Sequence, residues 1–300
     1  MIMNKEIPYV KYEPSHSKTH GIEVLLIEDL VQKYGGVNPS FPERPHQLDF
    51  YLLAFYTQGE TEHLVDFVRH KVKKDTIVYL TKGQVNAFKF EKNIKGFVLL
   101  FTKDFFEKQL NNLPKDAITR LFAPNLFTPV FQVDKNSNIG NYIKFLHDEY
   151  CKETDNFSKH NIITSLHTII LSKVEQIKND QTLCIKDSES LVLFLKFKTA
   201  LEKEYAISRN ASFYAKNLNI TYIRLNIVCK EIVGSTAKQF IDRFVILEAK
   251  RKLINSNIKS TELAFEIGFK EPTNFVKYFK KLTGFTPNYF KNKCSHHLPL

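Results

Sequence analysis

Short apolar runs follow one another along the N-terminal half of the chain, from about residue 46 to about residue 101. They are rich in aromatic and β-branched residues and are separated by Gly, Asn and Lys. The runs occupy residues 50–56, 64–68, 76–80, 88–90 and 96–101. Runs of this length and composition predict β-strands, and their spacing predicts a small all-β barrel or sandwich.

The spacing of the apolar residues then changes to that of helices. Residues 139–150 and 159–177 carry apolar side chains three or four positions apart, which predicts two amphipathic helices. The longer stripe has to be buried, either against the strands of its own chain or against a second copy of the protein. Its candidate dimer-interface residues are Ile162, Ile163, Leu166, Ile169, Ile170 and Val174. The polar residues 178–182 and 186–190 that follow predict a linker.

The last third of the chain repeats itself. Residues 214–220 align with residues 263–269, and residues 229–234 align with residues 279–284. Each copy has a small residue, Ala215 or Ala264, which allows two helices to cross closely. Each copy also has a residue suited to a tight turn with positive φ, Asn219 or Gly268. The repeat therefore predicts two helix-turn-helix units.

The expected boundaries of the helices support this interpretation. Thr221 is suited to cap the second helix of the first unit, which would end at Gly234. In the second unit Glu271 and Pro272 would begin the corresponding helix, and Gly284 would end it. Between the units, an apolar stripe predicts an amphipathic linker helix of roughly five turns. The stripe consists of Phe240, Phe244, Leu247 and Leu253.

The distribution of charge points to a ligand for this region. The net charge of the chain is +11. Residues 190–300 hold 19 Lys and Arg against 8 Asp and Glu, an excess of 11, whereas residues 1–189 hold 24 of each. A localised basic excess is typical of a surface that binds a polyanion, because neutralised phosphates release condensed counterions.

The second helix of such a unit presents its exposed N-terminal half to base edges, while Leu225, Val228, Phe275, Tyr278 and Phe279 are expected in the core. Asn can pair with adenine and Arg or Lys with guanine, and apolar side chains can meet the thymine methyl group. The candidate base contacts are Tyr222, Ile223, Arg224, Asn226 and Ile227 in the first unit, and Thr273, Asn274 and Lys277 in the second. The candidate phosphate contacts, which fix position without reading sequence, are Lys216, Thr221, Lys230, Lys238, Arg243, Lys280 and Lys281.

A connected series of spaced residues extends over roughly residues 190–293. It consists of Leu218–Thr221, Leu225, Lys230-Glu231, Gly234, Glu248–Arg251, Glu262–Ala264, Ile267–Phe269, Phe275, Tyr278–Lys281, Thr283–Pro287 and Tyr289. This series closely resembles the signature of AraC/XylS-family transcription regulators. The resemblance implies two units that enter successive major-groove segments on one face of duplex DNA. It also implies base contacts from Ile223, Asn226, Ile227, Pro272, Thr273, Asn274 and Lys277.

Three positions depart from the pattern of that family. Ile227 stands where Arg is common, and Cys229 stands where Phe is common. Pro272 cannot donate a hydrogen bond from its backbone. The first unit is therefore expected either to read bases more through apolar contacts than its relatives do, or to contribute mainly affinity.

The N-terminal half is similar, more loosely, to the cupin-like sensor domain of many such regulators. The similarity is carried by His46, Asp49–Tyr51, Gly59, Asp75–Ile77, Lys82–Asn86 and Gly96–Phe101. It implies a small-molecule effector pocket or a dimerisation surface, and it places the helix at 159–177 where such relatives dimerise. The expected fold is thus α+β in two domains. Residues 1–180 would form a cupin-like β-barrel with helices, and residues 190–293 an all-α domain with two helix-turn-helix units joined by a linker helix.

A metal-dependent cupin enzyme would share the expected strands. Such sites need several converging His and carboxylate ligands, but His46 has no His two positions later and Asn86 stands where a cupin His is often found. The remaining histidines that we considered are scattered and predict surface or helix-face roles; they are His63, His70, His147, His160 and His167. The chain has no Gly-rich phosphate loop, nucleophile elbow or HExxH motif. We therefore expect no enzyme activity, no catalytic residue, no metal and no cofactor.

Three classes of non-metal protein would use the same features differently. A protein that binds partners through its helices would explain the apolar stripes but not the segregated charge. RNA binding would favour surface aromatic residues for stacking, whereas the aromatic residues here fall on core positions of helices. A metal-independent cupin-type binding protein or enzyme with an accessory helical domain is the third class.

The sequence also predicts a location and partners. The opening residues MIMNKEIPYVKY lack the apolar run of a secretory signal, and no segment approaches the roughly 20 apolar residues of a membrane span. Four distant cysteines without a CxxC pair are typical of reduced thiols, so we expect a cytoplasmic protein with no membrane partner. As a hypothesis, a homodimer binds double-stranded promoter DNA, responds to an effector or to its oligomeric state, and activates transcription through RNA polymerase.

Overall fold

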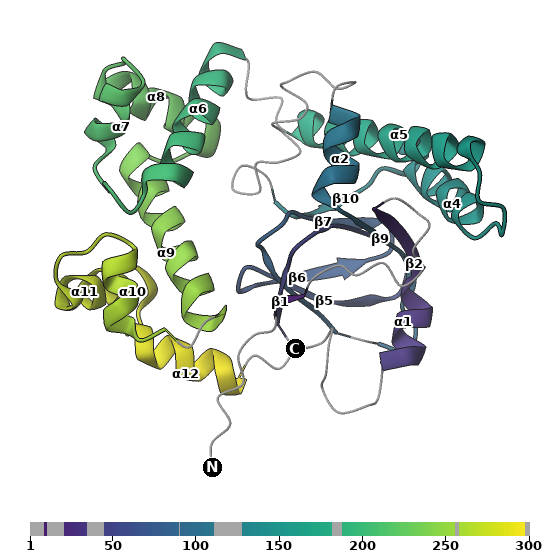
Figure 1. Ribbon diagram of the computed structural model, residues 1–300, viewed down its shortest axis with the longest axis horizontal. Coiled ribbons are helices and arrows are strands. Elements are labelled where there is room, and N and C mark those ends of the chain that lie inside the picture. Colours follow the sequence, from purple (N-terminus) through teal and green to yellow (C-terminus); the bar gives the residue numbers. More distant parts are fainter. Residues whose placement is uncertain are drawn as a thin grey trace. The chain divides into compact units, whose positions relative to one another are not determined.

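The structure is a computed structural model that describes residues 9–10, 21–34, 45–89, 91–110, 128–181, 188–255 and 258–297 (Figure 1). The described chain divides into two compact units. We call them the sheet unit, which ends with helix α5 (Phe157–Gln181), and the helical unit, which begins with helix α6 (Ser188–Glu204). The two-domain α+β organisation expected from the sequence is confirmed.

Ten strands of the sheet unit form two five-stranded sheets. The first sheet has the order β1 (Tyr9–Val10), β3 (His46–Leu48), β8 (Val85–Phe88), β5 (Glu60–Val65) and β6 (Val68–Lys73). The second has the order β10 (Val130–Gln132), β7 (Thr76–Leu80), β4 (Tyr51–Gln58), β9 (Lys95–Phe101) and β2 (Ile22–Leu26). Neighbouring strands are antiparallel except for β1 and β3.

The continuous apolar run of β4 is explained by burial on both of its faces. Leu53 and Phe55 point into an outer core that lies between the second sheet and the helices. Leu52, Ala54 and Tyr56 point into an inner core that lies between the two sheets. Because side chains alternate along a strand, a strand that is covered on both sides has no polar positions in its pattern. The predicted strand at 76–80 becomes β7 with the same bounds and is buried at every position.

The two sheets face each other but are not closed into one barrel among the residues that the structure describes. Strand β6 ends the first sheet and strand β10 ends the second. Of the two arrangements expected from the sequence, the strands therefore adopt the sandwich. A cupin-like fold remains compatible with two facing sheets.

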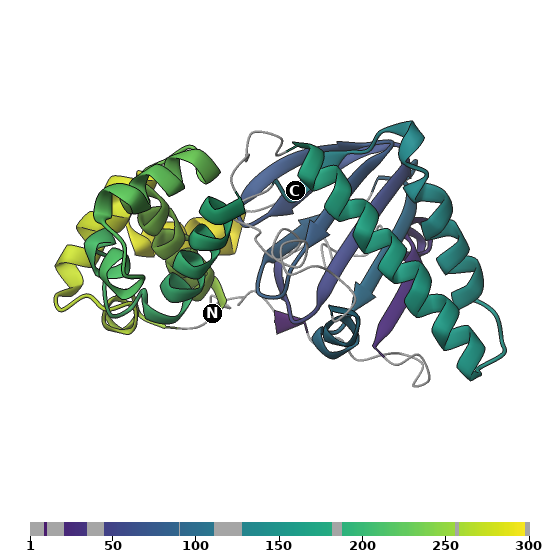
Figure 2. The same cartoon turned by 90° about the horizontal axis from the view of Figure 1, so that it is seen from above.

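Helices cover the outer face of the second sheet. They are α2 (Lys103–Leu110), α4 (Ile139–Tyr150) and α5 (Phe157–Gln181), and Figure 2 shows α5 lying across the strands beside α4. Helix α1 (Ile27–Tyr34) instead packs on the inner core through Ile27. A 3₁₀ turn (Lys135–Ser137) precedes α4.

The predicted dimer stripe on α5 is partly wrong. Ile163, Ile170 and Val174 are buried in the outer core of their own chain, and Leu166 packs partly against it. Ile163, Ile170 and Val174 are covered by the second sheet and by α4, so they are not available to a second copy of the protein, whereas Leu166 is only partly covered. Only Ile162 and Ile169 stay exposed, at 42% and 39%.

The helical unit consists of α6 (Ser188–Glu204), α7 (Ala211–Asn217), α8 (Tyr222–Val233), α9 (Ala237–Asn255), α10 (Ser260–Glu266), α11 (Pro272–Thr283) and α12 (Pro287–His297). Two aromatic clusters hold it together. Phe194, Phe197 and Tyr214 pack with Phe240 of α9 around the first repeat. The second repeat is built on Phe269, Phe275, Phe279 and Phe290.

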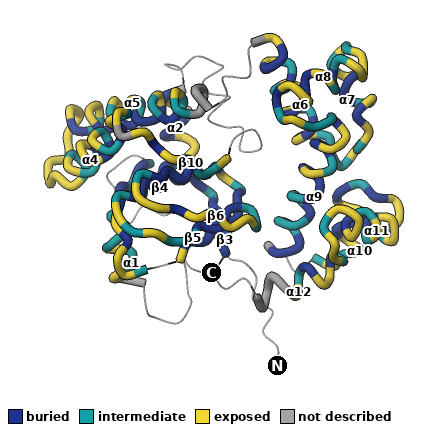
Figure 3. The backbone as a smooth tube through the Cα atoms, turned by 180° about the vertical axis from the view of Figure 1, so that it is seen from behind, coloured by how far each residue is buried: buried dark blue, intermediate teal, exposed yellow. Residues whose placement is uncertain are grey.

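Helix α9 is the predicted linker helix, with 19 residues. The predicted amphipathic pattern is wrong, because the buried residues are distributed around the helix and are not confined to one face. In Figure 3 buried residues recur along α9. The buried residues are Ala237, Phe240, Ile241, Phe244, Val245, Ile246, Ala249, Leu253 and Ile254. Helices α7 and α8 of the first repeat and α10, α11 and α12 of the second repeat all contact α9. The helix is therefore the shared core of both repeats.

Candidate nucleic-acid interface

The turn of the first unit joins α7 to α8. Asn219 adopts the predicted left-handed conformation, with φ of +54°. The Thr221 hydroxyl accepts a hydrogen bond from the backbone N–H of Arg224 at 3.1 Å, and so caps α8 as predicted. Gly234 ends α8 in the left-handed region, with φ of +64°. Local chemistry at three positions therefore fixes where α8 begins and ends.

The exposed edge of α8 is apolar. Tyr222, Ile223 and Ile227 are exposed at 46%, 70% and 49%, while Leu225 and Val228 are buried as predicted. Three large apolar side chains on one short surface are unusual for a helix that faces only water, and such patches mark contact surfaces. This edge can make van der Waals contacts with a ligand but can offer few hydrogen bonds.

Arg224 and Asn226 are placed differently from the prediction. Both are half-buried, and one Arg224 nitrogen, Nη2, lies 3.5 Å from Ser190 Oγ. The Asn226 side-chain oxygen accepts a hydrogen bond from the backbone N–H of Ala237 at 3.0 Å. It thereby caps α9, whose first N–H groups have no partner within the helix. Because pairing with adenine requires both the oxygen and the nitrogen of the amide, the structure gives Asn226 a structural role in place of the expected base contact.

The turn of the second unit joins α10 to α11 and requires glycine for two reasons. Gly268 has φ of +83°, which side chains rarely adopt. A Cβ atom at this position would also lie 1.7 Å from the backbone oxygen of Ala206. Helix α11 then begins with Pro272 at its first position and ends at Gly284, with φ of +81°, as predicted.

The exposed edge of α11 is polar. Thr273, Asn274 and Lys277 are all exposed, and none of their side chains makes a hydrogen bond or ion pair with another described residue. Pro272 beside them is half-buried. This edge can therefore offer donors and acceptors to a ligand without breaking an existing interaction.

Phe275 and Phe279 form the buried face of α11 as predicted, but Tyr278 is only half-buried. Its hydroxyl donates a hydrogen bond to Asp242 Oδ1 of α9 at 2.6 Å. Burial and the neighbouring carboxylate raise the pKa of this hydroxyl, so it remains a donor at neutral pH. Tyr278 connects the second repeat to the linker helix.

The candidate phosphate contacts fall into two groups. Lys216, Lys230, Lys280 and Lys281 are exposed. The rest already have internal partners: Lys238 pairs with Asp242, Arg243 donates to Ser235 Oγ, and the Thr221 hydroxyl caps α8. Only the first group can meet phosphates without competition from a neighbouring side chain.

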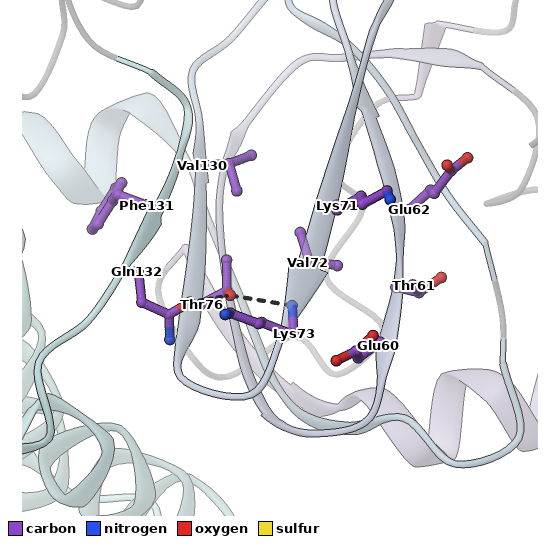
Figure 4. Close-up of a pocket in the computed structure, with 10 residues that line it drawn as sticks. All are labelled: Glu60, Thr61, Glu62, Lys71, Val72, Lys73, Thr76, Val130, Phe131 and Gln132. Atoms are coloured by element: carbon purple, nitrogen blue, oxygen red, sulfur yellow. Dashed lines mark hydrogen bonds between the residues drawn. The ribbon is translucent and has the colours of Figure 1, made fainter.

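The sheet unit has a cleft of about 590 Å³ where the edge strands β6 and β10 leave the two sheets open. Its lining, drawn in Figure 4, consists of Glu60, Thr61, Glu62, Lys71, Val72, Lys73, Thr76, Val130, Phe131 and Gln132. Val72 and Val130 belong to the inner core, whereas Glu60, Glu62, Lys71 and Lys73 carry charge. An apolar floor with a charged rim suits a small amphipathic molecule. The sequence offers no signal for this cleft, because it arises from the ends of two separate sheets.

A buried polar chain crosses the space between the sheets. The Tyr56 hydroxyl lies 3.0 Å from His63 Nδ1, His63 Nε2 bonds the oxygen of Asn86, and Asn86 Nδ2 lies 3.1 Å from His46 Nε2. The prediction of a surface or helix-face role for His63 is wrong, since it is 1% exposed on a strand. Burial lowers the pKa of His63 to about 4, so the ring is neutral at pH 7. Among the described residues, no three His, Cys, Asp or Glu side chains are grouped to hold a metal ion.

Comparison with known families bears on the helical unit. A family profile described as "Helix-turn-helix domain" matches residues 214–293, which include α8 and α11 with both turns. The C-terminal region is an AraC-type helix-turn-helix domain. Over 58 residues the chain is 36% identical to the uncharacterized HTH-type transcriptional regulator YisR of Bacillus subtilis (strain 168). That match covers 19% of this chain and 20% of YisR, so the chain spans about a fifth of the length of this relative.

Two solved structures are similar in part. ToxT of Vibrio cholerae, crystallised with an unsaturated fatty acid, is 14% identical with a TM-score of 0.44, over 92% of this chain and 96% of ToxT. The C-terminal domain of the response regulator yesN of Fusobacterium nucleatum is 23% identical with a TM-score of 0.30, over 32% of this chain and 93% of that domain. Within the part of the chain that the structure describes, no helix combines the length and the apolar character that crossing a membrane requires.

Proposed function

We propose that this protein is a sequence-specific, DNA-binding transcription regulator that reads duplex DNA with α8 and α11. The observation that carries the proposal is the pair of capped helices, each with an exposed N-terminal edge, in the domain that holds all of the excess positive charge. We assign residues 190–293 to DNA binding and residues 1–180 to sensing or dimerisation.

The exposed edges of α8 and α11 would recognise different chemical groups on the bases. Asn274 is suited to adenine and Lys277 to guanine, while Thr273 and Pro272 can contact neighbouring base edges. In the first unit, Tyr222, Ile223 and Ile227 are suited to thymine methyl groups, and Arg224 remains close enough to the edge to approach the major groove. Lys216, Lys230, Lys280 and Lys281 would bind phosphates. Lys238, Arg243 and Thr221 would contribute only where a phosphate competes with their internal partners.

The decisive experiment is selection of bound sites from a random duplex library by the full chain. We expect an enriched site with two segments about 10 base pairs apart, because helices on one face of the duplex meet the major groove once per turn. Affinity should fall steeply with salt, as expected when several phosphates are neutralised. Equal binding of all duplexes at moderate ionic strength would overturn the proposal.

We further propose that the protein is a homodimer and that α5 supplies part of the interface. Ile162 and Ile169 are exposed and lie seven positions apart, which places them on one face of α5. Sedimentation of the chain with Ile162→Asp and Ile169→Asp should give a monomer. Asn93→Asp, at an exposed position outside α5, should leave the dimer intact. A dimer that survives the paired Asp substitutions would place the interface elsewhere.

The cleft between β6 and β10 is our candidate effector site, and a promoter-bound dimer in the cytoplasm would activate transcription through RNA polymerase. An effector of this cleft should change DNA affinity in the wild-type chain and lose that effect in Lys73→Ala, at the rim. Transcription in vitro from a selected site, with and without the protein, tests activation directly. A fall in transcript would make the protein a repressor.

A further inference from the structure

We propose that Arg209 is a positioning residue that locks the two helix-turn-helix units at one separation, so that both DNA segments are read only at a fixed spacing. This inference rests on the proposed function. It concerns the joint between the units, not the edges that face the bases.

Arg209 lies between α6 and α7, ahead of the first unit, but its side chain reaches the turn of the second unit. Its Nη1 atom donates hydrogen bonds to the backbone oxygens of Ile267 and Gly268, each at 3.1 Å. Its guanidinium carbon lies 3.6 Å from the centre of the Phe269 ring. One planar side chain therefore holds three successive residues of the second turn.

The chemistry of this contact suits arginine in particular. The turn follows the C-terminus of α10, where backbone oxygens lack partners within the helix and carry partial negative charge. A guanidinium can donate to such oxygens and stack on an aromatic ring at the same time. A lysine ammonium has no planar face to stack and would satisfy only part of the contact.

Backbone contact reinforces the side-chain contact. The oxygen of Ala206, three residues before Arg209, occupies the space where a Cβ of Gly268 would lie. The segment around Ala206 and Arg209 therefore packs against the second turn without a gap. The corresponding turn residue of the first unit, Asn219, is exposed.

A second set of contacts joins the second unit to the linker helix. The Tyr278 hydroxyl of α11 donates to Asp242 of α9, and Lys238 pairs with the same carboxylate. Lys252 of α9 pairs with Glu266 of α10. Together with Arg209, these contacts join the second unit both to α9 and to the segment that precedes α7.

A fixed joint has a consequence for DNA recognition. When two binding modules are held at the correct separation, the second segment binds as an intramolecular event, and its contribution is lost when geometry prevents simultaneous contact. A loose joint would accept several spacings but would gain less from each, because the joint would have to be ordered on binding. A strong dependence of affinity on the spacing between the two DNA segments is therefore the measurable consequence of a fixed joint.

The test measures affinity of the full chain for the selected site and for the same site with one to three base pairs inserted between its segments. We expect insertion to weaken wild-type binding roughly 100-fold. In Arg209→Ala and Arg209→Lys the ratio between the two spacings should shrink to below about tenfold, with weaker binding at the original spacing. The control is Lys203→Ala, which removes one positive charge at an exposed position of α6. It should keep the wild-type ratio.

A distance measurement without DNA tests the fixed separation of the two units independently of the proposed DNA-binding function. Spin labels at Glu231→Cys and Leu282→Cys, on exposed positions of α8 and α11, report the separation of the units. Cys151, Cys184 and Cys294 would be replaced by Ser, whereas Cys229 can stay, because burial raises its thiol pKa to about 12. We expect one narrow distance in the wild type and a broad distribution in both Arg209 variants.

The outcomes are distinguishable. If the Arg209 variants keep the narrow distance and the wild-type ratio between the two spacings, Arg209 does not fix the separation of the units. Absence of any preferred duplex would overturn the proposed function, while the spin-label distances would still decide whether Arg209 fixes the joint. If Arg209→Ala fails to fold, as judged by circular dichroism, Arg209→Lys carries the test.

Discussion

The two helix-turn-helix units are copies of one plan that agree in some positions and differ in others. Both have a buried alanine where helices cross and a left-handed glycine that ends the second helix. Their turns and their exposed edges differ. The first has Asn219 and an apolar edge, and the second has Gly268 and a polar edge. Backbone geometry therefore sets the residues that the copies share, whereas the surroundings of each copy set the residues that distinguish them.

Substitutions of the two turn residues should reveal the largest difference between the units. Gly268→Asn should destabilise the helical unit by roughly 3 kcal/mol, because it adds strain at positive φ and collides with the Ala206 oxygen. Asn219→Gly should change stability by less than about 1 kcal/mol, since the left-handed conformation suits glycine. Urea unfolding of both variants measures the difference. Equal losses would show that the two turns have equivalent surroundings.

The polar edge should carry most of the discrimination between bases. Asn274→Ala and Lys277→Ala should each reduce the preference for the selected sequence by roughly 1–3 kcal/mol. Lys280→Ala should instead weaken binding to all sequences alike, because phosphate contacts carry no sequence information. Competition between selected and scrambled duplexes separates the two effects. An unchanged preferred site in both edge variants would refute our assignment of α11.

Substitution of Asn226 tests whether this residue caps α9 or contacts a base. Asn226→Ala should lower stability by about 1 kcal/mol, because α9 loses the side chain that accepts from the N–H of Ala237. The preferred bases should stay the same. Thermal unfolding together with a repeated site selection tests both statements. A changed preference at constant stability would restore Asn226 as a base contact.

The smallest expected effect concerns the apolar edge. Replacing thymine by uracil removes only a methyl group, which should cost about 0.8 kcal/mol for each methyl buried against Ile223 or Ile227. The same replacement in the segment read by α11 is the control and should cost less. Titration of the substituted duplexes gives the difference. Equal costs in both segments would remove the distinction between the edges.

The repeat can be predicted from the sequence because local chemistry defines it. Thr221, Gly234, Pro272 and Gly284 mark helix ends through interactions with nearby residues, so their roles are visible in the spacing. The roles of Asn226 and Arg209 are not visible, because their partners lie 11 and 58–59 positions away. Only the folded chain brings those groups together.

The same distinction explains the errors in the sheet unit. Strand β6 cannot be recognised from its pattern because Val72 is its only buried residue, and its hairpin with β5 turns at Asp66 and Phe67 with positive φ but without glycine. On α5 the stripe itself is predicted correctly, but periodicity cannot say whether a sheet or a second copy covers a given side. Ile163 and Ile162 are neighbours in sequence, yet one is buried and the next is exposed.

The chain of Tyr56, His63, Asn86 and His46 makes the sheet unit sensitive to acid. A histidine whose folded pKa lies near 4, against 6.5 in the unfolded chain, contributes stability that is present above pH 6.5 and is lost as the pH falls toward 4. His167, buried beside α2, has a pKa lowered to about 3 and adds to the same loss. Calorimetry at pH 7 and pH 5 should show the sheet unit melting earlier in acid while the helical unit, whose core has no histidine among its described residues, melts as before. Mild acidification would thus weaken the sheet unit selectively, so under our proposed function the helical unit would bind DNA with less influence from the unit that we propose as the sensor.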